Sequence, residues 1–487
     1  MNYRMIACVT SRILLAEAAL MSLSLLTALV YGESVWPFAA TMCLLTLVGF
    51  PFGFRAPKDT ALYARDGFAV VALAWVLLSV FGALPFVFSG DIPRFVDAFF
   101  ETVSGFTTTG ASILQEIEHL HKGILFWRSF THWVGGMGVL VFVMAVLPMS
   151  DGHGMHLMRA EVPGPSVGKL VSRMSESAKI LYEIYTFLTV LEIVILLLGG
   201  MPFFDSCVHA FGSAGTGGFS NRNLSVGAYD NPFFDAVIGT FMLLFSINFN
   251  LYYYLIMRRF AEVWKSETLW TFLGIVGASV LAIAGNITHM YGSFFTALRY
   301  SYFQVASIIS TSGFSTTDFN AWPAFSRAIL TVLMFIGACA GSTGGGIKVD
   351  RLIILVKASI RDMKKMLHPN AVASVRFEGK PLPERNIQGV HTFISVYLTI
   401  IVVSYLLLSL EGFDLISTFT ALSACINNIG PGLEMVGPTG NFAAFSSASK
   451  LLLSFNMLVG RLEIFPMILL FAPSMWHRRR LIRRNIS

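Results

Sequence analysis

The sequence predicts an all-α polytopic membrane protein, with four helix–re-entrant loop–helix repeats around a central pore and two extra transmembrane helices in front. Of its 487 residues, 55% are hydrophobic and 13% are charged, and the mean hydropathy is +0.68. Average soluble proteins have about 25% charged residues, so the bilayer is the natural solvent for this chain. Many apolar segments reach the roughly 20 residues that a spanning helix needs, and four shorter, glycine-rich segments lie between them.

The two leading helices are expected at 11–31 and 35–54, in a unit of residues 1–60. The first could instead be a signal peptide, because basic residues precede its apolar run. Against that reading, Glu17 interrupts the run, and no small-residue cleavage site with a polar mature domain follows. We therefore expect a retained helix.

Each of the four repeats has a spanning helix, a short re-entrant segment and a second spanning helix. The predicted segments are 68–90, 94–112 and 125–149; 180–200, 203–220 and 232–257; 268–289, 294–315 and 323–357; and 390–410, 414–432 and 443–472. The corresponding domains are 61–160, 161–262, 263–370 with a gating loop in its second helix, and 371–487 with a basic tail.

The re-entrant segments end in matched sequences. One glycine is shared by all four, at Gly110, Gly218, Gly313 and Gly430. Six residues before it stands a small residue, at Ser104, Gly212, Ser307 and Ala424. Internal repetition of this kind is strong evidence for a repeated architecture.

These loops have the chemistry of a cation filter. A permeating cation exchanges its water shell for protein oxygens, and glycine lets an extended loop turn successive carbonyls toward one axis. Threonine and serine add uncharged hydroxyl ligands, which suits the large, easily dehydrated K⁺. The alternative is that the glycines only allow close helix packing, but four loops in matched register favour a filter. The predicted K⁺ ligands are Thr108, Thr109, Gly110, Thr216, Gly217, Gly218, Thr311, Ser312, Gly313, Asn428, Ile429 and Gly430.

With these motifs, the chain resembles the Trk-H/Ktr-B family of potassium uptake channels and their plant HKT relatives, over about residues 60–472. The stretch Trp133-Val134-Gly135-Gly136-Met137-Gly138 and the two leading helices are similar to those of the Trk-H branch. The resemblance implies gated K⁺ uptake across the cytoplasmic (inner) membrane, with K⁺ as the permeating ion and no organic cofactor. It also implies a homodimer and a cytoplasmic nucleotide-binding (NAD/ATP) regulatory ring of the Trk-A/Ktr-A kind.

A gate is predicted where the third repeat's second helix is interrupted. The glycine-rich run from Gly337 to Gly346 cannot remain a stable helix. It is not a phosphate loop, because the Gly-Lys-Ser/Thr ending is missing. The resemblance implies that this loop crosses the pore below the filter; a flexible packing kink is the alternative. The predicted gate residues here are Gly341, Ser342, Thr343, Gly344, Gly345, Gly346 and Lys348.

Arg461 is the second predicted part of the gate. A charge deep in a spanning helix is costly and marks a functional candidate. The resemblance implies that Arg461 is a cationic barrier in the pore, near the gating loop. The alternative is a structural ion pair away from the pore. Glu463 is a possible partner, although residues i and i+2 do not face each other on a helix.

The charge pattern predicts orientation. Basic clusters follow every second spanning segment, so by the positive-inside rule those connections and both termini are cytoplasmic. The clusters are Arg55, Lys58 and Arg65; Arg159, Lys169, Arg173 and Lys179; Arg258 and Arg259; Arg361, Lys364 and Lys365; and His477, Arg478, Arg479, Arg480, Arg483 and Arg484. We expect the basic tail to contact membrane lipids and not nucleic acid.

The remaining polar residues are expected to be structural. Asp97, Asp205 and Asp414 stand near the starts of the re-entrant helices and are predicted N-caps. His132, His209 and His391 share no metal-ligand spacing, and the five cysteines are expected to be buried thiols.

A carrier and an enzyme are the alternatives to a channel. A cation-coupled (H⁺ or Na⁺) potassium symporter with alternating access is the main alternative, but such carriers usually have inverted repeats. Here all four repeats have the same order. An enzyme would need clustered His, Asp, Glu or Cys side chains, and the sequence shows no such cluster.

Overall fold

The computed structural model describes residues 1–53, 63–138, 174–370 and 373–476. In these ranges the regular structure is α-helical, with short 3₁₀ turns and one antiparallel hairpin, β1 (Arg376–Phe377) with β2 (Lys380–Pro381). The predicted all-α membrane fold is confirmed. Six of the described helices are long and apolar enough to cross a membrane, or seven if the bent pair α11–α12 is one span.

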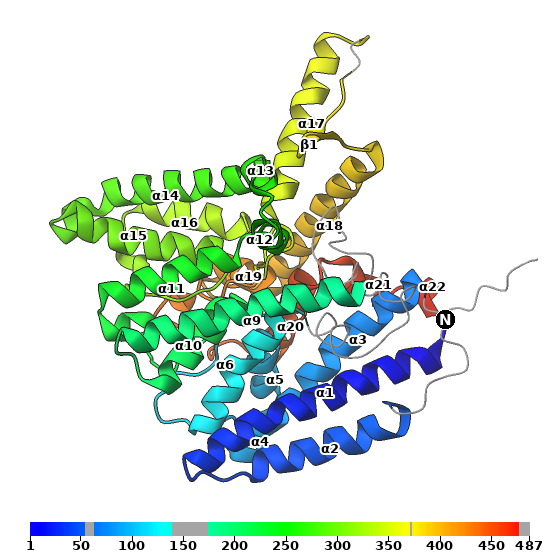
Figure 1. The fold of residues 1–487 in the computed structure, drawn as a ribbon, viewed down its shortest axis with the longest axis vertical. Coiled ribbons are helices and arrows are strands. Elements are labelled where there is room, and N and C mark those ends of the chain that lie inside the picture. Colours follow the sequence, from blue (N-terminus) through cyan, green and yellow to red (C-terminus); the bar gives the residue numbers. More distant parts are fainter. Residues whose placement is uncertain (54–62, 139–173, 371–372, 477–487) are drawn as a thin grey trace, which may run out of the picture.

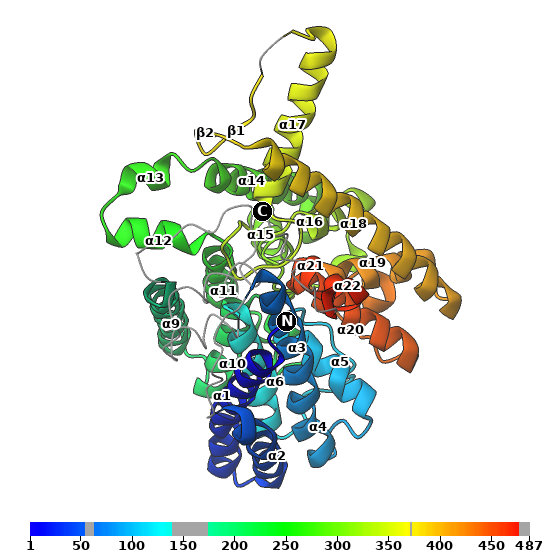
Figure 2. The same ribbon diagram turned by 90° about the vertical axis from the view of Figure 1, so that its right-hand side faces the viewer.

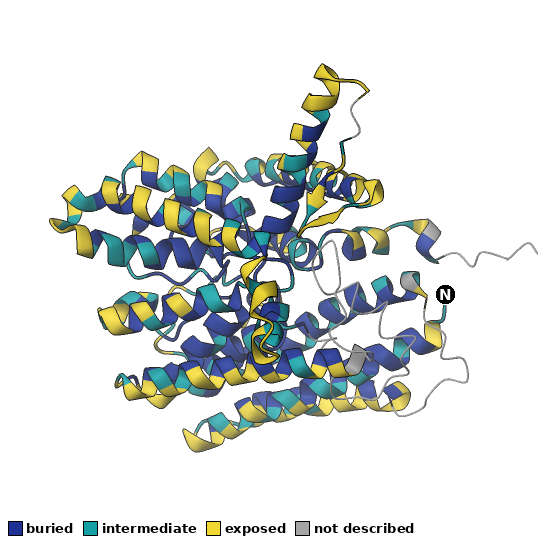
Figure 3. Ribbon diagram, turned by 45° about the horizontal axis from the view of Figure 1, so that its top comes forward, coloured by how far each residue is buried: buried dark blue, intermediate teal, exposed yellow. Residues whose placement is uncertain are grey.

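The leading pair, α1 (Tyr3–Val30) and α2 (Trp36–Gly53), lies side by side along one edge of the molecule (Figure 1). A methyl group added at Gly49 would lie 2.9 Å from Leu15, so the two helices approach closely there. Their outer faces are largely exposed (Figure 3), as expected for apolar helices whose solvent is lipid. Since α1 also packs against α3 and α6, it is part of the bundle.

Four repeats follow this pair, each containing one short helix that ends near the centre of the molecule. The first has α3 (Ala64–Gly82), α4 (Leu84–Ser89), α5 (Phe95–Phe106) and α6 (Lys122–Gly136). The second has α9 (Met174–Leu198), α10 (Phe203–Gly215), α11 (Pro232–Phe245), α12 (Phe249–Ile256) and α13 (Phe260–Trp264). The third has α14 (Glu267–Tyr291), α15 (Phe294–Ile309), α16 (Ala324–Phe335) and α17 (Val349–Leu367). The fourth has α18 (Glu384–Leu408), α19 (Leu415–Ile426), α20 (Ser447–Arg461), α21 (Phe465–Leu470) and α22 (Pro473–Trp476).

The short helices α5, α10, α15 and α19 match the predicted re-entrant segments, and we call them the pore helices. They are almost completely buried along their last two turns. Spanning helices surround them, and α17 projects from one end of the molecule (Figures 1 and 2).

Two of the predicted second helices are not continuous. The sequence predicts continuous spans at 232–257 and 443–472, and both are wrong. The chain bends by 92° between α11 and α12. It breaks again after α20, where Glu463 and Ile464 have positive φ. Apolar composition alone does not reveal these breaks, because they are stabilised by contacts with other repeats.

Several predictions lie outside the described residues. They include the 139–149 part of the first repeat's second helix, the boundary between the first two repeats, and several basic residues. Those residues are Arg55, Lys58, Arg159, Lys169, Arg173 and the whole tail cluster from His477 to Arg484.

Candidate functional site

All four pore helices end in the same backbone motif. Two bonds define it: an N–H donates back five residues, and the preceding N–H donates back three, as in a Schellman motif. The longer bonds run from Thr109 to Ser104, Gly217 to Gly212, Ser312 to Ser307 and Ile429 to Ala424, at 2.8–2.9 Å. The small residue shared by the four repeats is therefore the acceptor of this bond each time.

The motif puts a residue in the left-handed region at the same place in every loop. These residues are Thr108, Thr216, Thr311 and Asn428, with φ between 55° and 62°. Positive φ is unfavourable for threonine, and such strain clusters at functional sites. Local hydrogen bonds compensate in part. The Thr108 hydroxyl, for example, donates to the carbonyl of Thr107 (2.7 Å). Between loops, the Asn428 amide donates to the Thr109 hydroxyl (2.9 Å).

Two residues later, each loop has its shared glycine, again with positive φ (72–98°). A methyl group added to any of these glycines would lie less than 3.0 Å from a carbonyl oxygen of the next loop. The neighbours form a closed cycle: Gly110 faces Gly217 O, Gly218 faces Ser312 O, Gly313 faces Ile429 O and Gly430 faces Thr109 O. The four loops therefore form a ring of carbonyl oxygens packed too closely for any side chain.

A small hollow of about 110 Å³ opens on one side of this ring. All four shared glycines line it, together with polar residues that follow them, such as Ser112 and Ser220. One opening therefore reaches all four loops at once.

The glycine-rich segment 336–348 lies against the other side of the ring. The backbone N–H of Gly345 donates to the Thr311 hydroxyl (2.7 Å), and the Thr216 hydroxyl donates to the carbonyl of Thr343 (3.1 Å). A methyl group at Gly345 would lie 2.6 Å from the carbonyl oxygen of Asn427. The segment therefore touches the pore-helix ends of the second, third and fourth repeats.

The bend between α11 and α12 holds this segment in place. The N–H of Cys339 donates to Ser246 O (3.1 Å), and the N–H of Phe249 donates to Gly341 O (3.0 Å). The two helix breaks thus satisfy each other's free backbone groups, as non-helical backbone at membrane depth requires. This partner was not predicted from the sequence; the asparagines around the bend, including the N-cap Asn248, were the available signal.

Arg461, at the end of α20, binds backbone carbonyls. Its guanidinium donates to Thr343 O (2.7 Å) and to Gly135 O and Gly136 O (both 2.6 Å). It therefore joins the segment 336–348 to the Gly-Gly pair at the end of α6. Glu463 pairs with Arg351 instead of Arg461, so the suggested Arg461–Glu463 pair is wrong. The reason is the helix break after Arg461, where Glu463 has positive φ and its side chain reaches Arg351 of α17.

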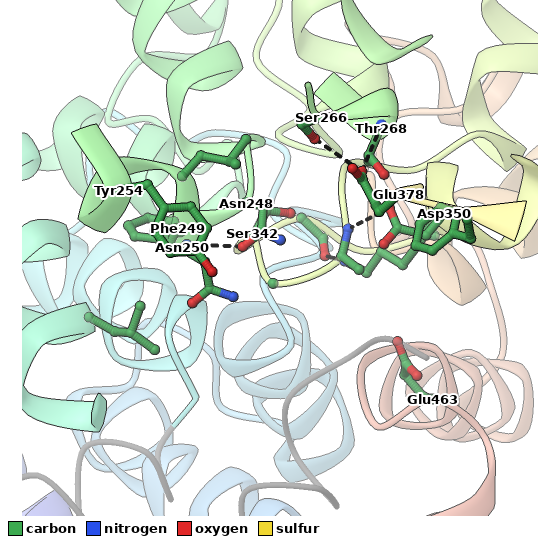
Figure 4. Close-up of a pocket in the computed structure, with 18 of the residues that line it drawn as sticks. Asn248, Phe249, Asn250, Tyr254, Ser266, Thr268, Ser342, Asp350, Glu378 and Glu463 are labelled. Atoms are coloured by element: carbon green, nitrogen blue, oxygen red, sulfur yellow. Dashed lines mark hydrogen bonds between the residues drawn. The ribbon is translucent and has the colours of Figure 1, made fainter. Parts of the chain in front are cut away.

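A larger cavity of about 640 Å³ lies beyond the segment, lined by Gly341, Ser342, Gly344–Gly346, Lys348 and Arg461. Lys348 is buried, and its ammonium donates to the carbonyl of Gly344 within the same segment. Figure 4 shows Asn248 near Ser342, and Asp350 beside the Glu378 group on the other side of the cavity. Glu378 caps the start of α14 by accepting from the hydroxyl of Ser266 and the N–H of Thr268 (both 3.1 Å).

The predicted N-caps are partly wrong. Asp414 caps α19, accepting from the N–H of Ser417 (2.8 Å). Asp97 and Asp205 instead lie in the first turns of α5 and α10. Asp97 pairs with Lys450 of the fourth repeat (2.6 Å), and Asp205 accepts from the amide of Asn221 (2.7 Å). Their side chains connect repeats or loops, and periodicity along one helix could not show this.

His132, His209 and most of the cysteines have the structural environments that were predicted, but one cysteine does not. His132 bonds Gly105 O (2.7 Å) and His209 bonds the Ser220 hydroxyl (3.1 Å). Four cysteines are buried, but Cys43 is exposed on α2. In the described ranges, no group of three or more His, Cys, Asp or Glu residues is arranged to hold a metal ion.

A buried ion pair behind the ring was also missed. Glu101 of α5 and Arg128 of α6 lie 2.7 Å apart, and both side chains are almost fully buried. They stand 27 residues apart in the sequence, so only the fold brings them together.

Comparison with known proteins gives consistent matches over nearly the whole chain. A family model, TrkH, described as cation transport protein, matches residues 37–478. The Trk system potassium uptake protein TrkH of Salmonella typhimurium is 38% identical over 98% of this chain and 100% of its own length. The Escherichia coli protein of the same name is 37% identical with the same coverage. The crystal structure of the potassium transporter TrkH from Vibrio parahaemolyticus has a TM-score of 0.87 at 35% identity, covering 98% of this chain and 100% of that one.

Proposed function

Because this chain belongs to the TrkH family of cation transport proteins, we propose that it takes up K⁺ through a gated, channel-like pore with a four-glycine filter. The observation that carries the proposal is the closed cycle of contacts between the four shared glycines and the carbonyls of neighbouring loops. Such a ring offers many uncharged oxygens and no fixed charge, which suits a monovalent cation that loses water cheaply.

In this proposal, the outer hollow is the entrance, the ring is the filter, and the segment 336–348 with Arg461 is the closed gate. A cation that leaves the ring meets the segment, which is bonded to Thr216 and Thr311. It also meets the Arg461 charge, whose repulsion grows in a low-dielectric setting. The protein would lie in the inner membrane with both termini cytoplasmic, as a homodimer, with a Trk-A-like regulatory ring opening the gate.

The test is the reversal potential of the purified protein in lipid bilayers with mixed K⁺ and Na⁺. We expect K⁺ and Rb⁺ to permeate better than Na⁺ and Li⁺. Equal permeability of K⁺ and Na⁺ in the unmodified protein would reject the K⁺ filter.

A further inference from the structure

In each repeat, a side chain of the pore helix forms a hydrogen bond with the loop just after the shared glycine; we call this bond the tether. The tethering position lies nine residues before the shared glycine in three repeats: Glu101, His209 and Gln304. Their side chains bond Ser112, Ser220 and Thr316, two or three residues after the glycine. In the fourth repeat, the neighbouring residue Thr420 accepts from the N–H of Leu433 (3.0 Å).

The first tether is built from a buried carboxylate with several donors. Glu101 accepts from the Ser112 hydroxyl (2.9 Å) and the Ile113 N–H (3.0 Å), both in its own loop. It also accepts from Nε of Arg128 (2.7 Å). The side-chain exposure is 0% for Glu101 and 2% for Arg128, so these charge-assisted bonds are shielded from water and strong.

Arg128 extends this tether to the second loop. Its guanidinium donates to the carbonyl of Ser220 (3.1 Å), two residues after Gly218, and lies 3.5 Å from the centre of the Phe219 ring. The Glu101–Arg128 pair therefore links the first and second loops at the joint between them, the place where Gly110 packs against Gly217 O. At the next joint, neutral groups form the link, from the N–H of Gly227 to Ser315 O (3.0 Å).

A buried ion pair is a poor choice for stability alone, because desolvation offsets much of its attraction. Its geometric demands are strict, however, and it holds two backbone segments at a fixed separation. Ion selectivity in such filters is attributed to cavity size or to the number of carbonyl dipoles. In both cases it depends on the positions of the carbonyl oxygens in the ring.

We propose that Glu101 and Arg128 are positioning residues that set the separation of the first two filter loops and thereby the preference for K⁺ over Na⁺. The inference rests on the proposed function, since it assumes that the ring selects the ion. Neither side chain needs to touch the ion. They act through the backbone of residues 112–113 and 219–220.

The test compares three variants in liposomes by K⁺/Na⁺ reversal potential, with currents normalised to folded protein. Glu101→Gln removes the charge of the tether and should lower the K⁺/Na⁺ permeability ratio several-fold, because the charge-assisted bonds that position the loop are weakened. Ser112→Ala leaves the ion pair and the net charge unchanged, and should lower the ratio less. Asp235→Asn is the matched control: its carboxylate is 3% exposed and pairs with Arg299 of α15 at 2.6 Å, away from the ring.

The outcomes separate the two proposals. A lowered ratio in Glu101→Gln and Ser112→Ala, with an unchanged ratio in Asp235→Asn, supports the positioning role. If the unmodified protein selects K⁺ and both ring variants keep its ratio, the pair is only structural and the inference is overturned. If Glu101→Gln does not fold, Ser112→Ala decides alone. If the unmodified protein shows no preference for K⁺ over Na⁺, the proposed function itself is rejected.

Discussion

At the scale of single residues, the shared glycines meet two requirements that no other residue meets together. Their φ values are positive, which costs an L-residue roughly 1–2 kcal/mol, and a carbonyl of the next loop occupies the space of a side chain. The second requirement is the stricter one, because a backbone carbonyl in a closed ring cannot move aside alone.

We therefore predict that alanine at Gly110, Gly218 or Gly313 abolishes selective K⁺ flux. Alanine at Gly430 should be milder, because its methyl group would lie 2.7 Å from Thr109 O, farther than the others from their carbonyls. Gly292→Ala is the control, with φ of 67° and no atom within 4 Å. Rubidium uptake per folded protein measures the effect. Equal losses in the Gly292 and Gly313 variants would mean that φ, and not the ring contact, matters.

Arg461 is the other residue with a specific consequence. Its bonds to Thr343, Gly135 and Gly136 hold the segment 336–348 against two repeats. In the proposed pore, its charge would also repel a passing cation. Arg461→Ala should raise K⁺ flux several-fold without any regulatory subunit, because both effects disappear.

Arg327→Ala is the comparison for Arg461→Ala. It breaks the pair with Glu434 at 2.8 Å, which does not involve the segment 336–348. We expect it to leave the flux unchanged. Lower yield and thermal stability of Arg461→Ala with no gain in flux per folded molecule would show that Arg461 only supports the structure.

At the scale of elements, two helix breaks form one unit. The segment 336–348 pairs some backbone groups within itself, as from the N–H of Gly337 to Ile347 O (2.7 Å). The bend at 246–248 pairs others, since Cys339 donates to Ser246 O and Phe249 donates to Gly341 O. Glycine keeps the segment thin enough to lie under the ring, where a methyl group at Gly345 would meet Asn427. Opening the proposed gate would therefore require both elements to move together.

Shortening the segment at 340–346 should therefore raise K⁺ flux in liposomes. Combined with Arg461→Ala, the gain should be less than additive, because both changes remove parts of one barrier. A double-mutant cycle of normalised flux measures this coupling. A fall in flux in both single variants would show that the gate lies elsewhere.

At the scale of the whole molecule, the four repeats act together because their loops close into one ring. All four pore helices end in the same motif and direct their C-terminal ends toward the ring. The outer hollow reaches all four loops directly, which supports the proposed channel-like pore over alternating access.

We predict discrete single-channel current steps in planar bilayers once the gate is weakened by Arg461→Ala. Currents should reverse at the K⁺ equilibrium potential and be independent of an imposed proton or Na⁺ gradient. Flux that stops when those gradients are removed, with no current steps, would favour the symporter instead.

The sequence by itself determined the membrane class, the four repeats and the register of the shared glycines, because apolar length and local glycine placement are properties of neighbouring residues. It also indicated the interrupted helix and Arg461. Only the tertiary structure decided what these residues touch. Three side-chain pairs join residues that lie 27 to 353 positions apart: Glu101–Arg128, Arg351–Glu463 and Asp97–Lys450. The bend at 246–248 likewise depends on contacts with a distant segment, 336–348. Their partners are selected by packing in three dimensions, which leaves no periodic signal along the chain.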